Sequence, residues 1–446
     1  MVSAVGAVRA QEVVRNKWRS TISASVWSRG SGLYEISDNY ELLERVKIVK
    51  VLHVIPSLAL VRGGPSVVLR NMARQLAQSG ITVDIATTDD NGHDRVAASH
   101  GEAISEEGVT YRYFPRQTRF YTFSWPLTHW LAHHVKEYDL VHIHALFSYA
   151  AMPAAYWAKR YGVPYIVRPL GVLNRWGMLN RRPWLKTISF RLIDRRIIAG
   201  AAAVHYTSEQ ERLEAAELGI TQRSIVIPNT VETPTNLSCH PRGCFRSLYP
   251  ELGDRPIILF LGRIDLKKGL DLLLPAFAEV RKLNPRAALV MAGDGEPEFI
   301  SKLKQESTRL GISSDTVWTG FLTGEDKWSA LADADVFVLP SYSENFGIAV
   351  VEAMASRLPV VVSDQVAIHR EVSEAKAGLV VSCAPEALAE ALTALIANDH
   401  LRAEMGINGH RLARTQFSPE GATETLIALY RELCEPISGA VEQAAT

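Results

Sequence analysis

Two kinds of apolar pattern alternate along this chain, short runs rich in β-branched residues and longer amphipathic stretches. Runs such as VKIVKVLHVIPS and PIILFLG have the composition of buried strands. Stretches such as PSVVLRNMARQLAQSG carry apolar residues at helical spacing, with a proline suited to a first turn and a glycine suited to a stop. The predicted strands cover 46–57, 82–88, 109–115, 140–145, 164–171, 202–208, 224–230, 256–262, 287–293, 316–321, 336–340, 359–364 and 378–382.

This alternation predicts parallel sheets with helices on both faces, because parallel neighbours are joined by crossover helices. A chain of 446 residues is too long for one compact core and predicts two doubly wound α/β domains in tandem. Prolines, glycines and the lack of an apolar period mark residues 233–255 as the passage between them. We expect an N-terminal domain over 46–235, a C-terminal domain over 236–417, and a helix over 418–436 that packs back on the first domain.

Residues 1–45 stand outside this pattern. Their first part is rich in basic residues and serine, and no convincing charged segment precedes the weakly apolar run VSAVGAV. We interpret them as a poorly ordered extension or a start placed too far upstream. A transit segment is the alternative, and we assign these residues no function.

Composition excludes several classes of protein. The 48 basic residues balance the 48 acidic ones, so no global field attracts nucleic acid. Four cysteines in a chain of this length form neither a disulfide framework nor a zinc site by their spacing. No apolar run approaches the roughly 18 residues that span a bilayer. A cytoplasmic protein in a reducing compartment fits best.

The polar and glycine residues that could carry chemistry fall where predicted strands end. Gly63 and Gly64 follow the first strand, and His144 ends the strand LVHIHA. Arg263 follows PIILFLG directly, and Glu344 lies just past VFVLP. Parallel sheets bind ligands beyond the carboxyl ends of their strands, so two such sheets facing each other would place these residues in one cleft.

The stretch SYSENFGIAVVEAMA, residues 341–355, places one acid before a helix start and another on the helix. Glu344 lies on the loop, Gly347 offers bare backbone where the helix would begin, and Glu352 follows on the helix. Free N–H groups between two carboxylates make a polar ligand site. The alternative is a surface turn followed by an ordinary solvated helix.

The stretch GRIDLKKG brings Arg263 and Lys268 into one loop that leads into a helix. Arginine offers a planar fork of donors for phosphate oxygens and lysine adds a compact charge; the alternative is solvated loop charge. By themselves, glycine pairs such as Gly63 and Gly64 usually form only a tight turn, and a histidine such as His144 is more often a satisfied residue at a strand end than a catalytic one. No Walker phosphate loop exists, and no Gly-x-Gly-x-x-Gly follows the first strand, which removes the main support for ATPases and nicotinamide enzymes.

GRIDLKKG, AGDGE and SYSENFGIAVVEAMA, in that order, resemble glycosyltransferase family 4, also called group 1. The resemblance covers roughly residues 47–430 and includes the Phe-Gly and Glu-Ala-Met flanks of the two acids. It implies the GT-B fold, two Rossmann-like domains facing each other across a cleft. HIHALFSY and RPLGVL are similar to bacterial members that build polysaccharides.

The resemblance implies a role for each matching residue of the C-terminal domain. Arg263 and Lys268 would hold the diphosphate of a nucleotide-sugar, and Glu352 would hydrogen-bond the ribose hydroxyls. Glu344 would contact the donor sugar. The backbone N–H groups close to the sugar and phosphate would be those of Asn345, Phe346 and Gly347.

On the N-terminal side, Gly63 and Gly64 would line the phosphate and the acceptor, and His144 would lie beside the donor sugar. The chain departs from the family's pattern at Thr230, where a glycine is frequent. It also departs at Arg168 and Leu170, which precede the acceptor-side Gly171. These departures bear on the acceptor and not on the fold.

The implied activity is transfer of a sugar, with retention of configuration, from a UDP- or GDP-sugar to a saccharide or lipid-linked acceptor in cell-surface polysaccharide or glycolipid assembly. We expect no metal ion and no cofactor besides the donor substrate, with Arg263 and Lys268 supplying the charge. Two alternatives remain, a catalytically idle scaffold of the same fold and a nucleotide-sugar epimerase. The two acids and the two cations argue against the first, and only product analysis excludes the second.

Residues 174–197 form a basic segment interleaved with aromatic residues. Pro183 could start a helix whose Leu185, Ile188, Leu192 and Ile193 share one face. A basic amphipathic helix of this kind can lie on an anionic membrane, which would make the protein peripheral at the inner face of the cell membrane. The alternative is a helix that packs on the core and carries solvated arginines.

Overall fold

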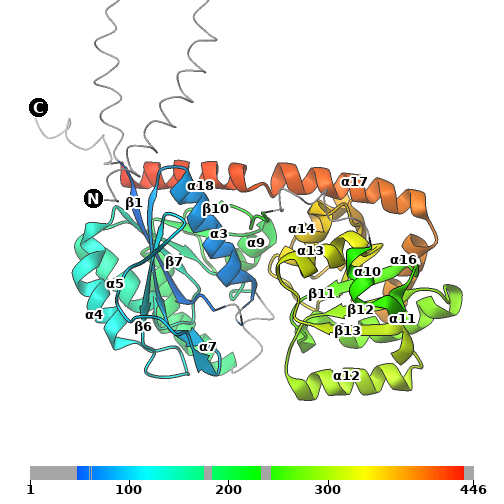
Figure 1. The fold of residues 1–446 in the computed structure, drawn as a ribbon. Coiled ribbons are helices and arrows are strands. Elements are labelled where there is room, and N and C mark those ends of the chain that lie inside the picture. The colour runs from blue at the N-terminus through cyan, green and yellow to red at the C-terminus, as the bar shows by residue number, and fades with distance from the viewer. Residues whose placement is uncertain (1–47, 60, 62, 175–182, 233–242, 436–446) are drawn as a thin grey trace, which may run out of the picture.

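The computed structural model describes residues 48–59, 61, 63–174, 183–232 and 243–435. The extension at 1–45 lies outside these residues, as do 233–242 of the predicted passage between domains. The remainder folds into two α/β domains that lie side by side (Figure 1). The predicted fold of two tandem, doubly wound, Rossmann-like domains is confirmed.

The N-terminal domain is built on an eight-stranded sheet in the order β10-β9-β8-β7-β1-β2-β6-β5. All neighbours are parallel except β5, which pairs antiparallel with β6 at one edge. The strands are β1 Lys50–Ser57, β2 Thr82–Thr88, β5 Ile104–Glu106, β6 Val109–Phe114, β7 Leu140–His144, β8 Tyr165–Arg168, β9 Ala203–Tyr206 and β10 Ser224–Val226. The order reverses between β1 and β7, so the point at which such folds bind ligands lies beyond the ends of these two strands.

The C-terminal domain has a six-stranded, wholly parallel sheet in the order β13-β12-β11-β14-β15-β16. Its strands are β11 Ile257–Leu261, β12 Ala288–Ala292, β13 Thr316–Gly320, β14 Val336–Leu339, β15 Val360–Ser363 and β16 Gly378–Val381. Here the order reverses between β11 and β14. Every residue of β11, β12, β14 and β15 is buried, as expected for parallel strands covered by helices on both faces.

Helices cover both sheets, and their apolar faces form the cores. Those of the N-terminal domain are α3 Gly64–Gln78, α4 Trp125–His134, α5 Ala151–Tyr161, α7 Pro183–Ser189, the π-helical turn η3 Phe190–Asp194, α8 Arg195–Ala199 and α9 Glu209–Glu217. Those of the C-terminal domain are α10 Cys244–Leu248, α11 Leu270–Leu283, α12 Pro297–Arg309, α13 Gly324–Asp333, α14 Ile348–Ala355, α15 His369–Glu374, α16 Pro385–Ile396 and α17 Asp399–Gln416.

Residues 89–108, where the sequence predicted no strand, contain three short strands, so the prediction was wrong there. They form the two-residue strands β3 Asp90–Asn91 and β4 Asp94–Arg95, which pair as a hairpin, and the edge strand β5. Every residue of β5 is exposed, and for this reason it lacks the apolar alternation by which strands are recognised. Among the described residues, none of the helices combines the length and apolar content that a bilayer crossing requires.

The last described helix packs on the first domain. Helices α17 and α18 (Pro419–Cys434) run along one side of the molecule and connect the two domains (Figure 1). Leu426, Leu429 and Tyr430 of α18 belong to the core cluster formed by β1, β2 and α3. The Tyr430 hydroxyl hydrogen-bonds Nδ1 of His142 in β7 at 2.7 Å. Because α18 completes the N-terminal core, the two domains are tied at this end as well as through residues 233–255.

Candidate active site

Loops from the central strands of the C-terminal sheet are joined into one surface by backbone hydrogen bonds. The loop after β11 pairs with the loop after β12 through Ile264 N to Asp294 O, 2.8 Å. The turn Leu266–Lys268, also in the loop after β11, receives the N–H of Tyr342 from the loop after β14 on the Lys267 carbonyl at 2.9 Å. The switch point of the sheet is therefore a rigid platform that presents the side chains of three loops together.

Three cations surround Glu344 on this platform. Nζ of Lys268 donates to Oε2 of Glu344, forming an ion pair between the loops after β11 and β14. Burial alone would raise the pKa of the Glu344 carboxyl, but Lys268, Lys267 and Arg263 together hold that pKa below its ordinary value. Burial lowers the pKa of Lys267. The sequence brought out Arg263, Lys268 and Glu344, which the structure places together, but it did not single out Lys267.

The segment that carries Glu344 is fixed along its length. The Glu344 N–H donates to the Gln365 carbonyl at 3.0 Å, and the Glu344 carbonyl accepts from the N–H of Ala367 at 2.9 Å. Gly347, the N-cap of α14, has a φ of +83°, a left-handed conformation that favours glycine. The ring of Phe346 is buried edge-on against Phe417, 5.5 Å between centroids. The Phe346 side chain therefore belongs to the core, and only its backbone can serve a ligand.

Glu352 lies on α14, and its carboxylate is held by a neighbour that the sequence did not bring out. Nζ of Lys327, from α13, donates to Oε1 of Glu352 at 2.7 Å. Both side chains are largely buried, with 21% of Lys327 and 11% of Glu352 exposed. The ion pair orients the carboxylate while part of it stays at the surface, as a contact to hydroxyl groups requires.

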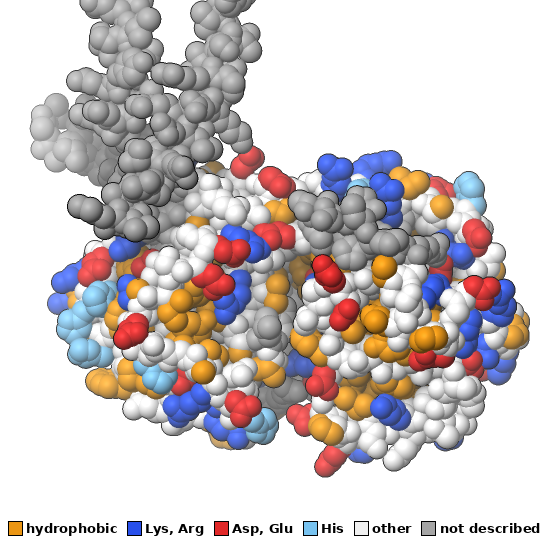
Figure 2. Space-filling view, in the orientation of Figure 1, with side chains coloured by type: hydrophobic (Ala, Val, Ile, Leu, Met, Phe, Trp, Pro, Cys, Tyr) orange, Lys and Arg blue, Asp and Glu red, His pale blue; other side chains and the backbone are white. Residues whose placement is uncertain are grey.

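Helix α3 of the N-terminal domain faces α14 across the junction of the domains. A Cβ on Gly64, the first residue of α3, would lie 3.7 Å from Cγ2 of Ile348, the first residue of α14. Gly63 is exposed at the N-cap of α3. Two helix N-termini therefore meet here, and their unpaired N–H groups and positive dipole ends favour an anion. In Figure 2 the two lobes meet along a furrow, with charges of both signs scattered over the face in view.

His144 lies beneath the surface. The residue is only 1% exposed, and its Nε2 lies 2.9 Å from Nδ1 of His53. The ring of His142 packs against both of these histidines, and His205 packs against His142. Burial lowers the pKa of all four histidines, and the charge of the buried Arg168 guanidinium lowers it further. His144 is therefore a buried, neutral imidazole at the end of β7. The predicted contact with a donor sugar stays a prediction and would need the ring to turn outward.

Among the described residues, His53, His142 and His144 form the group with the spacing of metal ligands, their nearest nitrogens lying within 4.8 Å of one another. The charge of Arg168 opposes a metal ion at this place. Its pKa, lowered by burial to about 10, leaves the guanidinium charged at neutral pH. We therefore assign no metal to this cluster.

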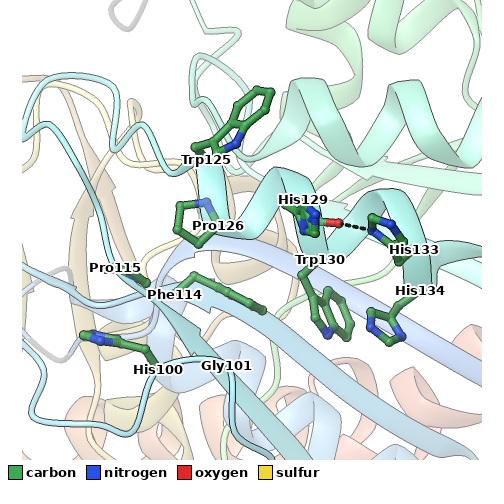
Figure 3. A pocket seen from close by; sticks show the side chains of 10 residues that line it. All are labelled: His100, Gly101, Phe114, Pro115, Trp125, Pro126, His129, Trp130, His133 and His134. Carbon is green, nitrogen blue, oxygen red and sulfur yellow. Dashed lines mark hydrogen bonds between the residues drawn. The ribbon is translucent and has the colours of Figure 1, made fainter.

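A separate hollow of about 510 Å³ lies along α4 (Figure 3). Its lining comprises His100, Gly101, Phe114, Pro115, Trp125, Pro126, His129, Trp130, His133 and His134. None of these residues is among those predicted to bind or transfer a sugar. The candidate site is therefore the junction of the domains and not this hollow.

Comparison with known proteins agrees with this arrangement. The family model described as "Glycosyl transferases group 1" matches residues 246–412, and that described as "Glycosyl transferase 4-like domain" matches residues 63–230. D-inositol 3-phosphate glycosyltransferase 2 of Catenulispora acidiphila is 30% identical over 415 residues, covering 83% of this chain and 93% of its own. Alpha-D-kanosaminyltransferase of Streptomyces kanamyceticus is 32% identical over 184 residues, 41% of this chain and 47% of its own.

The fold has solved counterparts at lower identity. Anabaena HepE, crystallised with UDP and glucose, superposes with a TM-score of 0.69 at 18% identity, covering 86% of this chain and all of its own. Two facing Rossmann-like domains, with charged loops at the switch point of the C-terminal sheet, are the arrangement of a GT-B glycosyltransferase. The chain belongs to glycosyltransferase family 4, the group 1 glycosyl transferases.

Proposed function

We propose that this glycosyltransferase moves a sugar, with retention of configuration, from a UDP- or GDP-sugar to a saccharide or lipid-linked acceptor in the assembly of cell-surface polysaccharide or glycolipid. The observation that carries the proposal is the grouping of Arg263, Lys267 and Lys268 around Glu344, at the N-terminus of α14. Asp265 also lies near Arg263 and Lys267, so three cations face two carboxylates, which leaves a surplus of one positive charge. A nucleotide diphosphate is the ligand class that matches this surplus.

In the proposed reaction, Arg263 and Lys268 bind the diphosphate and stabilise the negative charge that grows on it as the bond from the anomeric carbon to the phosphate oxygen breaks. The acceptor hydroxyl oxygen bonds to the anomeric carbon from the same face, and its proton passes to the departing phosphate oxygen. Glu344 has a lowered pKa, so it stays ionised at neutral pH and accepts hydrogen bonds from donor-sugar hydroxyls. Glu352 accepts hydrogen bonds from the ribose hydroxyls. Arg263 and Lys268 take the place of a metal ion at the diphosphate.

The proposal is tested first by binding and then by product analysis. Thermal stability is measured with UDP, GDP and ADP and with their sugar conjugates, because a ligand at about 100 times its Kd stabilises by about 2.7 kcal/mol. Conjugates that stabilise are then incubated with candidate acceptors, and NMR of the product reports its anomeric configuration. A product of inverted configuration contradicts retention. A product without acceptor identifies an epimerase, and silence with every nucleotide favours a scaffold.

We also propose that the segment Pro183–Ala199 touches an anionic membrane surface, which would bring the enzyme to a lipid-linked acceptor. Trp184, Ile188 and Leu192 follow one another at helical spacing and are 63%, 49% and 56% exposed. Arg191 and Arg195 are exposed on the same segment. Exposed apolar residues flanked by arginines fit the interface of an anionic bilayer better than a core-packing face. Trp176, Arg181 and Arg182 of the predicted basic segment lie outside the described residues.

A further inference from the structure

Glu211 is a buried carboxylate at the junction of the domains that the proposed reaction does not use. It lies in the first turn of α9, is 1% exposed, and accepts three hydrogen bonds. Oε1 accepts from the N–H of Gly171 at 2.6 Å. Oε2 accepts from the N–H of Thr207 at 2.8 Å and from its hydroxyl at 2.9 Å. The carboxylate therefore fixes both the acceptor-side loop after β8 and the hydroxyl direction of Thr207.

Thr207 connects this hydrogen-bond network to the C-terminal domain. The Thr207 hydroxyl donates its hydrogen bond to Glu211, so its oxygen is left to accept, and Nδ2 of Asn345 donates to it at 2.9 Å. Asn345 follows Glu344 directly on the loop after β14. The chain of hydrogen bonds thus runs from a buried carboxylate of one domain to the residue beside the proposed sugar contact of the other.

Gly171 allows a close contact between the same two loops because it has no side chain. Its φ is +74°, and a Cβ added to it would lie 2.2 Å from Cγ of Asn345, so only glycine lets this side chain lie against the loop. Leu170 before it also has a positive φ, +60°. Such strain persists only where the surroundings impose it. A second bond, from Nδ2 of Asn174 to Oγ of Ser343 at 3.2 Å, joins the same two loops.

We propose that Glu211 is a positioning residue for sugar transfer, which acts through Thr207 and Gly171 to hold Asn345 and the Glu344 loop against the acceptor-side loop 168–174. The inference deepens the proposed function and rests on it, because alignment of donor and acceptor loops matters only to a group transfer between the domains. Small displacements of reacting groups cost large factors in rate, so loss of one link is expected to lower turnover more than donor binding.

A purely local role for Glu211 is a capping box. Ser208 caps α9 by accepting from the N–H of Glu211 at 3.1 Å, and Ser-x-x-Glu is the sequence pattern of that box. Glutamine serves a capping box as well as glutamate does. In the structure, however, both carboxylate oxygens of Glu211 accept hydrogen bonds. A glutamine at this position would turn its amide N–H groups toward a donor, so Glu211→Gln separates the two roles.

The test compares Glu211→Gln, Thr207→Val and Thr207→Ser with wild type in steady-state kinetics, using the active donor identified above. Glu209→Gln, on the exposed side of the same helical turn, is the matched control. We expect Glu211→Gln and Thr207→Val to lower kcat about tenfold with donor KM changed no more than about threefold, the loss of one charge-assisted link. Thr207→Ser, which keeps the hydroxyl, and Glu209→Gln should stay within about twofold of wild type.

Unchanged kcat in both Glu211→Gln and Thr207→Val would overturn the proposal, as would an equal loss in Thr207→Ser. Hydrogen exchange of the segment 341–347, measured without substrate, gives a second readout that needs no activity. We expect faster exchange there in Glu211→Gln and Thr207→Val, and equal exchange overturns the inference. If wild type transfers no sugar from any donor, the proposed function fails, and this exchange measurement still decides whether Glu211 orders the Glu344 loop.

Discussion

Lys268 and Glu344 form an ion pair that joins the loops after β11 and β14. The two residues are 76 positions apart in sequence, yet they lie at adjacent strand ends because β11 and β14 flank the switch point of the sheet. Each is only 16% exposed at its side chain. Glu344 therefore fixes the Lys268 ammonium in position, which in our proposal is the position that the donor diphosphate requires.

Replacing Lys268 tests this charge directly. We expect Lys268→Ala to lower kcat by about 100-fold or more at saturating donor, because it removes a preorganised charge from the leaving phosphate. The measurement is steady-state transfer under saturating donor, with Lys282→Ala as the control, since Lys282 forms an exposed pair with Glu279 on α11. A fall of less than about threefold in Lys268→Ala would contradict the assignment.

Glu352 should act on the ribose of the nucleotide. We expect Glu352→Gln to weaken binding of the active nucleotide about tenfold, the loss of one hydrogen bond to a charged group. Affinity for the 2′,3′-dideoxy analogue should not change, because it lacks the hydroxyls that the carboxylate would bind. Lys327→Met breaks the ion pair but keeps the carboxylate, and so measures how much of the effect comes from the pair alone. Equal weakening for nucleotide and analogue would contradict a ribose contact.

The buried histidines predict a loss of stability in mild acid. Burial and the Arg168 charge lower the pKa of His53 to about 3 in the folded protein, against 6.5 when unfolded. Above pH 6.5 neither state binds this proton, and below it only the unfolded state does. The contribution of His53 to stability is therefore complete above pH 6.5 and is lost as the pH falls toward 3, by about 1.4 kcal/mol at one pH unit below 6.5.

Urea denaturation at pH 7.5 and 5.5 measures this effect. His53→Gln should reduce the difference in unfolding free energy between the two pH values by about 1.4 kcal/mol. The exposed His129, on α4, provides the control, and His129→Gln should leave the difference unchanged. An identical pH dependence in wild type and His53→Gln would show that this histidine does not titrate on unfolding.

Much of this architecture was predictable because its physics is local. Parallel strands covered on both faces must be apolar, so runs such as PIILFLG indicate such strands without information from the rest of the chain. The switch-point rule then locates Arg263 and Glu344 at one edge without knowledge of their neighbours. The edge strand β5 escaped prediction because its residues are exposed and it is held by pairing with β6 alone.

The partners of the site residues were not predictable for a different reason. Lys327, Thr207 and Glu211 matter through contacts with residues distant in sequence, and none belongs to a glycine-rich or paired-charge motif. A signal for Glu211 was present in the Ser-x-x-Glu spacing, but that spacing indicates a helix cap. Burial of His144 and Phe346 likewise depends on how neighbouring elements pack, which no motif encodes.

The exposed apolar residues of α7 and η3 should bind anionic vesicles. Trp184 and Leu192 would enter the headgroup region while Arg191 and Arg195 face anionic lipid. We expect wild type to co-sediment with vesicles of phosphatidylglycerol and phosphatidylcholine, and Trp184→Ala to weaken the partition about tenfold, since a buried aromatic side chain contributes roughly 1.5–3 kcal/mol. Arg191→Ala with Arg195→Ala should weaken binding to anionic vesicles and make it insensitive to salt.

The control for vesicle binding is an exposed apolar residue elsewhere. Ile407, on α17, has the same exposed fraction as Leu192, 56%. Its helix has no comparable run of exposed apolar residues. Ile407→Ala should therefore bind vesicles as wild type does. Equal, negligible sedimentation of wild type and Trp184→Ala would end the membrane proposal and favour a soluble saccharide acceptor. Binding to pure phosphatidylcholine as strong as to the anionic mixture would assign the contact to the apolar residues and exclude a role for the arginines.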